Sequence, residues 1–153
     1  MISFREATPD DAAEVAQVYL TSRKAFVSFA PIAHTESEVT QWIAATLIPS
    51  GRVTVAIQDN VIVGMMALER EHELGWIDQL YMAPAAVGQG IGSRMVERAK
   101  AELGSPIRLY TFQANAGARR FYERHGFLPI AFGDGQENEE KCPDVLYEWS
   151  ERA

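Results

Sequence analysis

The stretch AAVGQGIGSRMVERA, residues 85–99, decides the fold class that this sequence predicts. Glycines at alternate positions lead directly into an amphipathic pattern, and these glycines are Gly88, Gly90 and Gly92. The apolar residues of that pattern recur four apart, at Ile91, Met95, Ala99 and Leu103. Orphan N–H groups and the helix dipole favour an anion at a helix N-terminus, and glycine lets that anion approach the backbone. The stretch therefore predicts a strand, a phosphate-binding turn and a helix.

Two common phosphate sites fit this turn badly. A Walker loop closes with Gly-Lys-Ser/Thr, whereas Gly92 is followed by Ser93-Arg94. A Rossmann dinucleotide site has the spacing G-x-G-x-x-G, ordinarily in the first strand–helix unit, whereas this turn is G-x-G-x-G in mid-chain. A nucleotide triphosphatase and a Rossmann dehydrogenase are therefore not expected.

Capping patterns predict two helices before the glycine turn. Thr8, Pro9 and Asp11 predict a helix over residues 9–23. Thr35 and Glu38 form a capping box for a second helix, which the apolar spacing extends to residue 47.

Alternation of apolar and polar residues predicts about seven strands. They lie at residues 2–7, in a hairpin at 51–69, and at 73–84, 106–112, 128–132 and 144–150. Asp59-Asn60 tolerates the positive φ of the hairpin turn, and Gly126 ends a last helix within residues 115–127. The order predicts one α/β (α+β) domain over residues 1–153, with a mixed, mostly antiparallel sheet and about four helices on its faces.

The bulk composition is that of an ordinary globular domain. The chain has 153 residues, of which 47% are hydrophobic and 23% charged, with a net charge of −7. That charge argues against a nucleic-acid partner and is easier to reconcile with a cationic one. The sequence shows neither a long apolar run nor a secretion signal, which favours a cytoplasmic protein without membrane partners.

Cysteine and histidine usage predicts no disulfide and no metal site. Cys142 is the single cysteine, so an internal disulfide is excluded. The histidines, His34, His72 and His125, show none of the paired spacings that metal sites use.

Two segments together resemble a known family. LYMAPAAVGQGIGSRMV (residues 80–96) and YTFQANAGARRFYERHGF (residues 110–127) resemble the GCN5-related N-acetyltransferases (GNAT), and the predicted element order is similar to that fold. The family motif is Arg/Gln-x-x-Gly-x-Gly/Ala, which Gly90 and Gly92 match, with Gly88 also glycine as in many members. Val87 departs at the first position, which commonly uses its backbone N–H. The resemblance implies acetyl-CoA as co-substrate, without a metal.

The resemblance also implies a coenzyme-binding surface. The strand before the turn is implied to bind the acetyl and pantetheine portions, and the turn to bind the pyrophosphate. The candidate residues are Leu80, Tyr81, Met82, Val87, Gly88, Gln89, Gly90, Ile91, Gly92, Ser93, Asn115 and Tyr122. Asn115 equally fits a helix cap. Three arginines are candidates for the ribose 3′-phosphate or a solvated face: Arg119, Arg120 and Arg124.

Two groups are implied to assist acetyl transfer. Tyr122, the tyrosine of FYE, resembles the general acid of the family. A phenol with an ordinary pKa of about 10 is protonated at neutral pH and can donate to a departing thiolate. Tyr122 also shares a helical face with apolar residues, so a packing role is the alternative. The N–H of Leu80 is implied to donate to the thioester carbonyl.

The general base is the least determined group. Some family members have a Glu four residues before the position of Leu80, where this sequence has Trp76. Strand alternation predicts that Asp78 faces the same side as Trp76 and Leu80, barring a bulge, so Asp78 is the preferred base. Glu69 and Glu73 are alternates, and loss of the proton to water is a further one.

The acceptor groove is expected between residues 23–36 and the acidic stretch 133–144. Aromatic and acidic residues there fit a small-molecule or peptide amine, possibly a cationic one, and the candidates are Phe26 and Phe29 with Glu137, Glu139 or Glu140. Trp76, on the strand at 73–84, is a further candidate for contact with the acceptor. Phe26 and Phe29 equally fit packing within a connecting turn, and the acidic stretch equally fits a solvated loop.

The predicted function is acetyl-CoA-dependent N-acetyl transfer to a primary amine by direct attack. The alternative is a non-catalytic acyl-CoA-binding sensor or regulatory module, motivated by Trp76 and Val87. Tyr122 favours the enzyme, because binding alone does not require a phenol. The apolar strand at 144–150 fits a homodimer interface and equally an ordinary buried strand.

Overall fold

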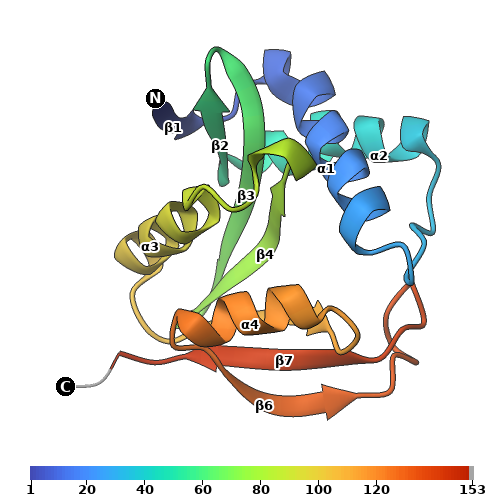
Figure 1. The fold of residues 1–153 in the computed structure, drawn as a ribbon, viewed down its shortest axis with the longest axis vertical. Coiled ribbons are helices and arrows are strands. Elements are labelled where there is room, and N and C mark those ends of the chain that lie inside the picture. Colours follow the sequence, from blue (N-terminus) through green and yellow to red (C-terminus); the bar gives the residue numbers. More distant parts are fainter. Residues whose placement is uncertain (152–153) are drawn as a thin grey trace.

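The computed structural model describes residues 1–151 as one seven-stranded sheet, in the order β1-β2-β3-β4-β5-β7-β6 (Figure 1). All neighbours are antiparallel except β4 and β5, which are parallel, so the predicted mixed, mostly antiparallel sheet is confirmed. The strands are β1 (Ile2–Glu6), β2 (Val53–Gln58), β3 (Val61–Glu71), β4 (Leu74–Met82), β5 (Ile107–Phe112), β6 (Leu128–Gly133) and β7 (Asp144–Trp149).

The helices are α1 (Ala12–Phe26), α2 (Glu36–Trp42), α3 (Ile91–Leu103) and α4 (Ala116–Arg124). A 3₁₀ turn at Pro9–Asp11 precedes α1, so the α-helix starts and ends three residues later than the sequence predicts. The second capping box is confirmed, because the Glu38 N–H donates to Thr35 Oγ1 at 3.1 Å and the Thr35 N–H donates to Glu38 Oε1 at 2.8 Å. After α2 the chain continues as a π turn, Ile43–Leu47.

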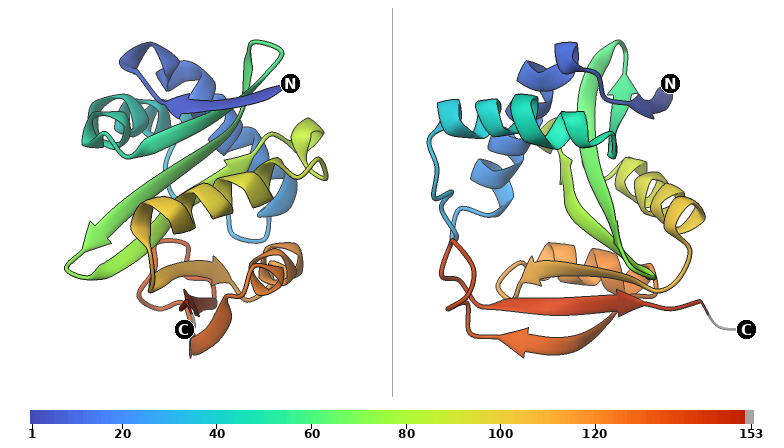
Figure 2. Two further views of the ribbon diagram at one scale, coloured as in Figure 1. Left: turned by 90° about the vertical axis from the view of Figure 1, so that its left-hand side faces the viewer. Right: turned by 180° about the vertical axis from the view of Figure 1, so that it is seen from behind.

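The helices cover the two faces of the sheet and create two cores. Val15, Ile43 and Met65 belong to the core on the α1 and α2 face, and Met95 and Phe127 to the core on the α3 and α4 face. Figures 1 and 2 show α1 and α3 on opposite sides of the central strands. No helix within residues 1–151 has the length and apolar character needed to cross a membrane.

Two local predictions are resolved by the sheet. Asp59 and Asn60 have φ values of 51° and 66°, so the tight hairpin turn between β2 and β3 is confirmed. Strand β7 lies between β5 and β6, and its Val145 and Tyr147 are fully buried. The apolar alternation of residues 144–150 is therefore explained by the core.

Strands β4 and β5 separate soon after they meet. Within the described chain they pair only at Gly75 with Ile107 and at Trp76 with Arg108. Strand β5 instead pairs along its whole length with β7, and β7 pairs with β6. Figure 1 shows β7 and β6 directed away from β4. The edge of β4 from residue 77 to residue 82 is left without a strand neighbour, and we call this gap the β4–β5 opening.

Candidate active site

A β-bulge at Asp78 interrupts the ladder between β3 and β4. Ala67 pairs with Gln79 and the next residue, Leu68, pairs with Ile77. Asp78 is thus the extra residue on β4, which changes the phase of side-chain alternation at this point.

The bulge overturns the predicted alternation. Trp76 pairs with Glu69, next to the core-facing pair of Leu68 and Ile77, and so lies on the opposite face from Ile77. Leu80, beyond the bulge, packs against the α3 core, on the same face as Ile77. Trp76 and Leu80 therefore lie on opposite faces, and the expectation that they share one is wrong.

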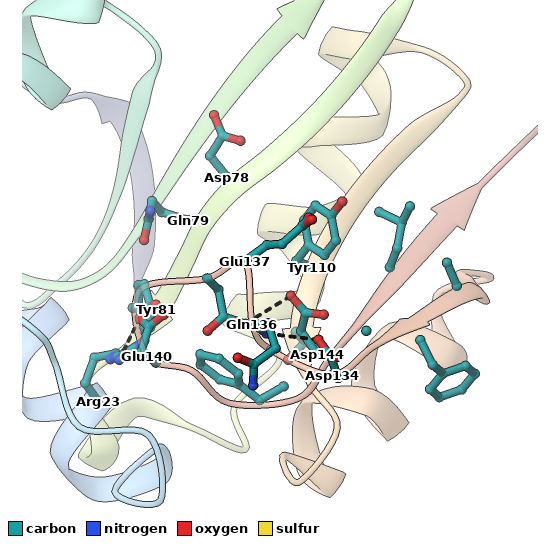
Figure 3. Close-up of a pocket in the computed structure, with 18 of the residues that line it drawn as sticks. Arg23, Asp78, Gln79, Tyr81, Tyr110, Asp134, Gln136, Glu137, Glu140 and Asp144 are labelled. Atoms are coloured by element: carbon teal, nitrogen blue, oxygen red, sulfur yellow. Dashed lines mark hydrogen bonds and ion pairs between the residues drawn. The ribbon is translucent and has the colours of Figure 1, made fainter.

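A cleft of about 1010 Å³ extends from β4 and β5 to α1 and to residues 134–143, which we call the β6–β7 segment. Strand β4 contributes Asp78, Gln79 and Tyr81 to its wall, and β5 contributes Tyr110 (Figure 3). Glu137 lines the cleft from the β6–β7 segment. Asp78, the preferred base, and Glu137, a predicted acceptor residue, therefore line the same cleft.

Asp78 is exposed to the cleft, but its carboxyl group has acidic neighbours. Partial burial against the cleft wall, a hydrogen bond with Glu69 and the charges of Glu69 and Glu71 raise the pKa of Asp78 to about 7. A carboxyl group with such a pKa exchanges protons near neutral pH, as a general base must. Glu73 lies in the exposed turn before β4 and is absent from the described cleft lining.

The backbone of β4 presents donors to the β4–β5 opening. The Ala83 N–H donates to the Val63 carbonyl of β3 at 2.8 Å. Because N–H groups alternate in direction along a strand, those of Leu80 and Met82 point away from β3 into the opening. This is the orientation that the predicted contact of Leu80 with a thioester carbonyl requires.

The glycine turn before α3 uses its glycines in two ways. Gly88 and Gly90 have φ values of 81° and 80°, and a Cβ at either would meet no atom within 4 Å among the described residues. Their requirement is therefore the left-handed backbone, and the space above them is open. At Gly92 a Cβ would lie 3.3 Å from Cζ of Phe121, so this glycine permits close packing of α3 on α4.

The first turn of α3 offers its N–H groups to an anion. Gly90 is the N-cap residue, and having no side chain it cannot cap the helix as a serine or asparagine does. Val87 is 47% exposed, and Ile91 is buried in the core. Both side chains are apolar, so each residue can offer a hydrogen bond to a ligand only from its backbone. Gln89 is held by Gln58, which donates a side-chain hydrogen bond to it at 2.8 Å.

Tyr122 lies on the buried face of α4, with only 9% of its surface exposed, and packs edge-on against Phe127. Burial, together with the nearby Tyr81 hydroxyl, raises the pKa of Tyr122 above that of an ordinary phenol. Tyr122 is thus fully protonated at neutral pH and lies near Tyr81, which lines the cleft.

The helix that carries Tyr122 is fixed by polar contacts at both ends. Asn115 Oδ1 accepts from the Ala118 N–H at 3.1 Å, so the predicted cap is confirmed. The Tyr147 hydroxyl accepts from Arg119 Nε at 3.0 Å and donates to Glu123 Oε2 at 2.6 Å. The guanidinium of Arg119, a candidate for the ribose phosphate, is therefore already engaged by Tyr147.

Of the three aromatic residues predicted to bind the acceptor, two contact residues that line the cleft and one is not part of its described lining. Trp76 stacks on Tyr110 with ring centroids 5.8 Å apart, next to the cleft. Phe29 is 42% exposed and contacts the cleft residue Phe112 edge-on at 6.0 Å. Phe26 is 43% exposed and is absent from the described lining of the cleft.

Sequence reasoning missed Arg23, which lines the cleft although only 4% of its surface is exposed. One guanidinium nitrogen, Nη2, donates to the Ala30 carbonyl at 2.9 Å and to Glu140 Oε2 at 3.2 Å. Arginines near helix ends usually face water, which hid this residue. Its spacing of four from the cleft residue Tyr19 was the available signal.

No cluster of three or more side chains suited to a metal occurs within the described part of the chain. The sequence profile of the acetyltransferase (GNAT) family matches residues 16–127. The chain belongs to the GNAT family.

Solved structures agree with the GNAT fold. The PaiA N-acetyltransferase of Thermoplasma acidophilum, in complex with coenzyme A, has a TM-score of 0.79 at 16% identity, covering 99% of both chains. Apo YjaB of Escherichia coli has a TM-score of 0.78 at 21% identity, covering 97% of both. Arabidopsis thaliana Naa50 with the bisubstrate analogue CoA-Ac-MVNAL has a TM-score of 0.73 at 18% identity, covering 98% of this chain and 99% of its own. No curated protein matches this GNAT sequence.

Proposed function

We propose that this GNAT protein is an acetyl-CoA-dependent N-acetyltransferase that acetylates a primary amine by direct attack. The bulge at Asp78 is the observation that carries the proposal. It places a carboxyl group with a pKa of about 7 in the cleft beside the open edge of β4. Membership of the GNAT family supports acyl transfer with coenzyme A as the chemistry of this edge.

The residues of this chain fit the coenzyme. The left-handed glycines leave open space before the start of α3, where N–H groups favour a pyrophosphate. We assign this role to the backbone of residues 87–93. The opening beside Leu80 and Met82 offers strand-like donors to an extended amide chain such as pantetheine. When bound, acetyl-CoA supplies an activated thioester.

Each step then has a group to assist it. Asp78 accepts the proton of the acceptor ammonium, which makes the nitrogen nucleophilic. The Leu80 N–H donates to the carbonyl oxygen, on which negative charge develops during attack. Tyr122 gives its proton to the departing thiolate. The Tyr122 hydroxyl carries this proton at neutral pH, because burial keeps the pKa of the phenol above its ordinary value.

The charge of the cleft supports a cationic acceptor. Five carboxyl groups line it, from Asp78, Asp134, Glu137, Glu140 and Asp144. Arg23 is the single Lys or Arg in the described lining, and Glu140 is its ion-pair partner. The net negative wall favours a small polyamine or the N-terminus of a peptide. The peptide-based analogue bound by Naa50 is a precedent for the second class.

The proposal is tested by thiol release from acetyl-CoA with polyamines, aminoglycosides, amino acids and short peptides as acceptors, beside calorimetric titration with acetyl-CoA. We expect coenzyme binding, with turnover on cationic amines above that on neutral ones. Binding without turnover on any acceptor would instead support an acyl-CoA-binding sensor. Absence of binding would contradict both functions.

A further inference from the structure

We propose that Arg23 determines the acceptor class by donating a hydrogen bond from Nε to a main-chain carbonyl of a peptide acceptor. The inference rests on the proposed function and chooses between the two acceptor classes, polyamine and peptide, that the charge of the cleft leaves open. Arg23 lines the cleft, and its side chain is only 5% exposed. Among residues 1–151, its Nε is the only buried side-chain nitrogen or oxygen without a hydrogen-bond partner. A buried donor without a partner is costly, so this nitrogen needs an acceptor that the protein itself does not supply.

The guanidinium of Arg23 is fixed by contacts of its other atoms. Its Nη2 donates to the Ala30 carbonyl at 2.9 Å and to Glu140 Oε2 at 3.2 Å. Its central carbon lies 5.9 Å from the ring centroid of Tyr19 and 5.7 Å from that of Phe112, within the range of cation–π contact. Arginine does not lose its proton in proteins, so Nε–H is a permanent donor.

The charge of the cleft favours an uncharged oxygen as the partner of Nε. Glu140 already compensates the charge of Arg23, and the four other carboxyl groups of the lining disfavour a second anion. A polyammonium acceptor carries only donors, so it would cover Nε without satisfying it. A peptide carries an ammonium group for the acidic wall and a carbonyl oxygen for Nε. The peptide class therefore matches both features of the cleft.

The extent of the cleft agrees with an extended peptide. Figure 3 shows Arg23 beside Tyr81 and Glu140, away from Asp78, the proposed base. Asp78 and Tyr81 are three residues apart on β4, which corresponds to about 10 Å along a strand. An extended peptide covers this distance in about three residues. With its N-terminal nitrogen at Asp78, the peptide thus brings the carbonyl of one of its first three residues to Nε.

Thiol-release kinetics with a matched set of acceptors test the inference. The parent acceptor is the tetrapeptide amide of alanine. Three analogues each have one of its peptide bonds replaced by an (E)-alkene, which keeps the length and shape but removes the carbonyl oxygen. Spermidine represents the polyamine class.

The proteins are the wild type, Arg23→Lys and, as a matched control, Arg52→Lys. Lysine at position 23 keeps the charge opposite Glu140 but has no donor at the place of Nε. Arg52 is exposed and absent from the described lining of the cleft.

For the wild type and Arg52→Lys, we expect kcat/KM to be about tenfold lower for one of the three analogues than for the parent peptide, which reflects one lost charge-assisted hydrogen bond. In Arg23→Lys, kcat/KM for the parent peptide should fall by a similar factor, and that analogue should show no further loss. The kcat/KM of Arg23→Lys for spermidine should stay within about twofold of the wild-type value, because a polyamine offers Nε no oxygen.

Equal wild-type kcat/KM for the parent peptide and all three analogues would overturn the inference, and this comparison does not depend on the folding of a variant. Equal losses on peptide and spermidine in Arg23→Lys would give Arg23 a purely structural role and overturn the inference too. Turnover of spermidine but not of the peptide would overturn the inference and leave the proposed function intact. Absence of turnover on every amine of the wider panel would overturn both.

Discussion

At the scale of single residues, two ionisable groups of the site differ in their surroundings in a way that suits opposite tasks. Asp78 faces the cleft beside Glu69 and Glu71, and partial burial together with these carboxylates raises its pKa to about 7. Tyr122 is buried among aromatic rings, and burial raises its pKa further above neutrality. Above pH 7 the first group can accept a proton while the second still holds one. That window is where acetyl transfer by both groups is expected.

Replacing Tyr122 by Phe removes the proposed acid and leaves its ring. We expect Tyr122→Phe to lower kcat by about 10²-fold or more and to leave the dissociation constant of acetyl-CoA nearly unchanged. Thiol-release kinetics and calorimetric titration measure the two quantities. An unchanged kcat in an active protein would show that Tyr122 has only a packing role.

Replacing Asp78 by Asn changes stability in a pH-dependent way. The folded pKa of Asp78, about 7, exceeds the value of about 3.9 expected in an unfolded chain. Between these values the folded protein binds more protons, so the contribution of Asp78 to stability falls as pH rises through 7. Asn mimics the protonated carboxyl group. We expect Asp78→Asn to raise Tm at pH 8 by roughly 2–4 °C, a gain limited by solvent screening, and by less at pH 5.

Thermal unfolding at both pH values checks this expectation. Glu73→Gln, in the exposed turn before β4, is the control and should show no pH-dependent gain. A change in Tm of equal size at pH 5 and pH 8 for Asp78→Asn would contradict the raised pKa.

Single residues were predictable where a local pattern carries the chemistry. Asn115 follows from helix-capping rules, and its cap is present. Tyr122 was singled out by the FYE pattern, although its catalytic role stays a proposal. The burial of Arg23 and the ion pair with Glu140 join positions 117 residues apart. No local pattern reports such a contact.

At the scale of elements, the glycine turn and the bulge shape the site. Glycines with left-handed backbones appear as a sequence motif, so the turn before α3 was predictable. The bulge at Asp78 and the separation of β4 from β5 depend on how strands pair. The alternation of residue types in 73–84 is a property of a single strand, whereas a bulge is a property of the pairing between two strands. The extra residue therefore becomes visible only in the ladder between β3 and β4. The strands were thus predictable and the face of Leu80 was not.

Two glycine-to-alanine substitutions should have opposite effects on stability. At Gly90 the left-handed φ of 80° strains any other L-residue, so Gly90→Ala should lower the free energy of unfolding by about 1 kcal/mol. Gly117 lies within α4 with a helical backbone and space for a Cβ, whose nearest contact would be Asn115 Oδ1 at 4.0 Å. Gly117→Ala should raise the free energy of unfolding by about 0.5–1 kcal/mol.

Urea denaturation of both variants gives these two values. Gly90→Ala should also weaken acetyl-CoA binding, whereas Gly117→Ala should not. Equal stability of Gly90→Ala and the wild type would show that the left-handed turn is not required for the native fold.

At the scale of the whole molecule, contacts between residues far apart in sequence join the β6–β7 segment of the cleft wall to the chain around α1 and α2. Adjacent residues of the β6–β7 segment reach the chain around α1 and α2: Glu140 pairs with Arg23 at 3.2 Å and Glu139 with His34 at 2.7 Å. Figures 1 and 2 show this segment beside the connection from α1 to α2. The two contacts hold the wall of the acceptor cleft in place, and they differ sharply in burial.

The two neighbouring acids therefore predict unequal effects. In the Arg23–Glu140 pair the side chains are 5% and 20% exposed, so Glu140→Gln leaves a buried guanidinium without its counter-charge. We expect a loss of about 2 kcal/mol in the free energy of unfolding. In the His34–Glu139 pair the side chains are 51% and 69% exposed, and Glu139→Gln should change stability by less than about 0.5 kcal/mol. Urea unfolding of both variants measures the two losses in the free energy of unfolding. Losses of equal size would contradict the predicted difference between the buried and the exposed pair.

The pH dependence of kcat/KM for acetyl transfer, compared between the wild type and Asp78→Asn with one cationic acceptor, tests the central claim most directly. Both proteins use the same acceptor, so the ionisation of the amine cancels when the kcat/KM of the wild type is divided by that of Asp78→Asn. This ratio therefore isolates the effect of Asp78. We predict that the ratio rises with pH up to about 7, then levels at about 10²-fold or more, because the base must be ionised. A ratio that stays near one at every pH would contradict the assignment of this cleft as a site of base-assisted acetyl transfer.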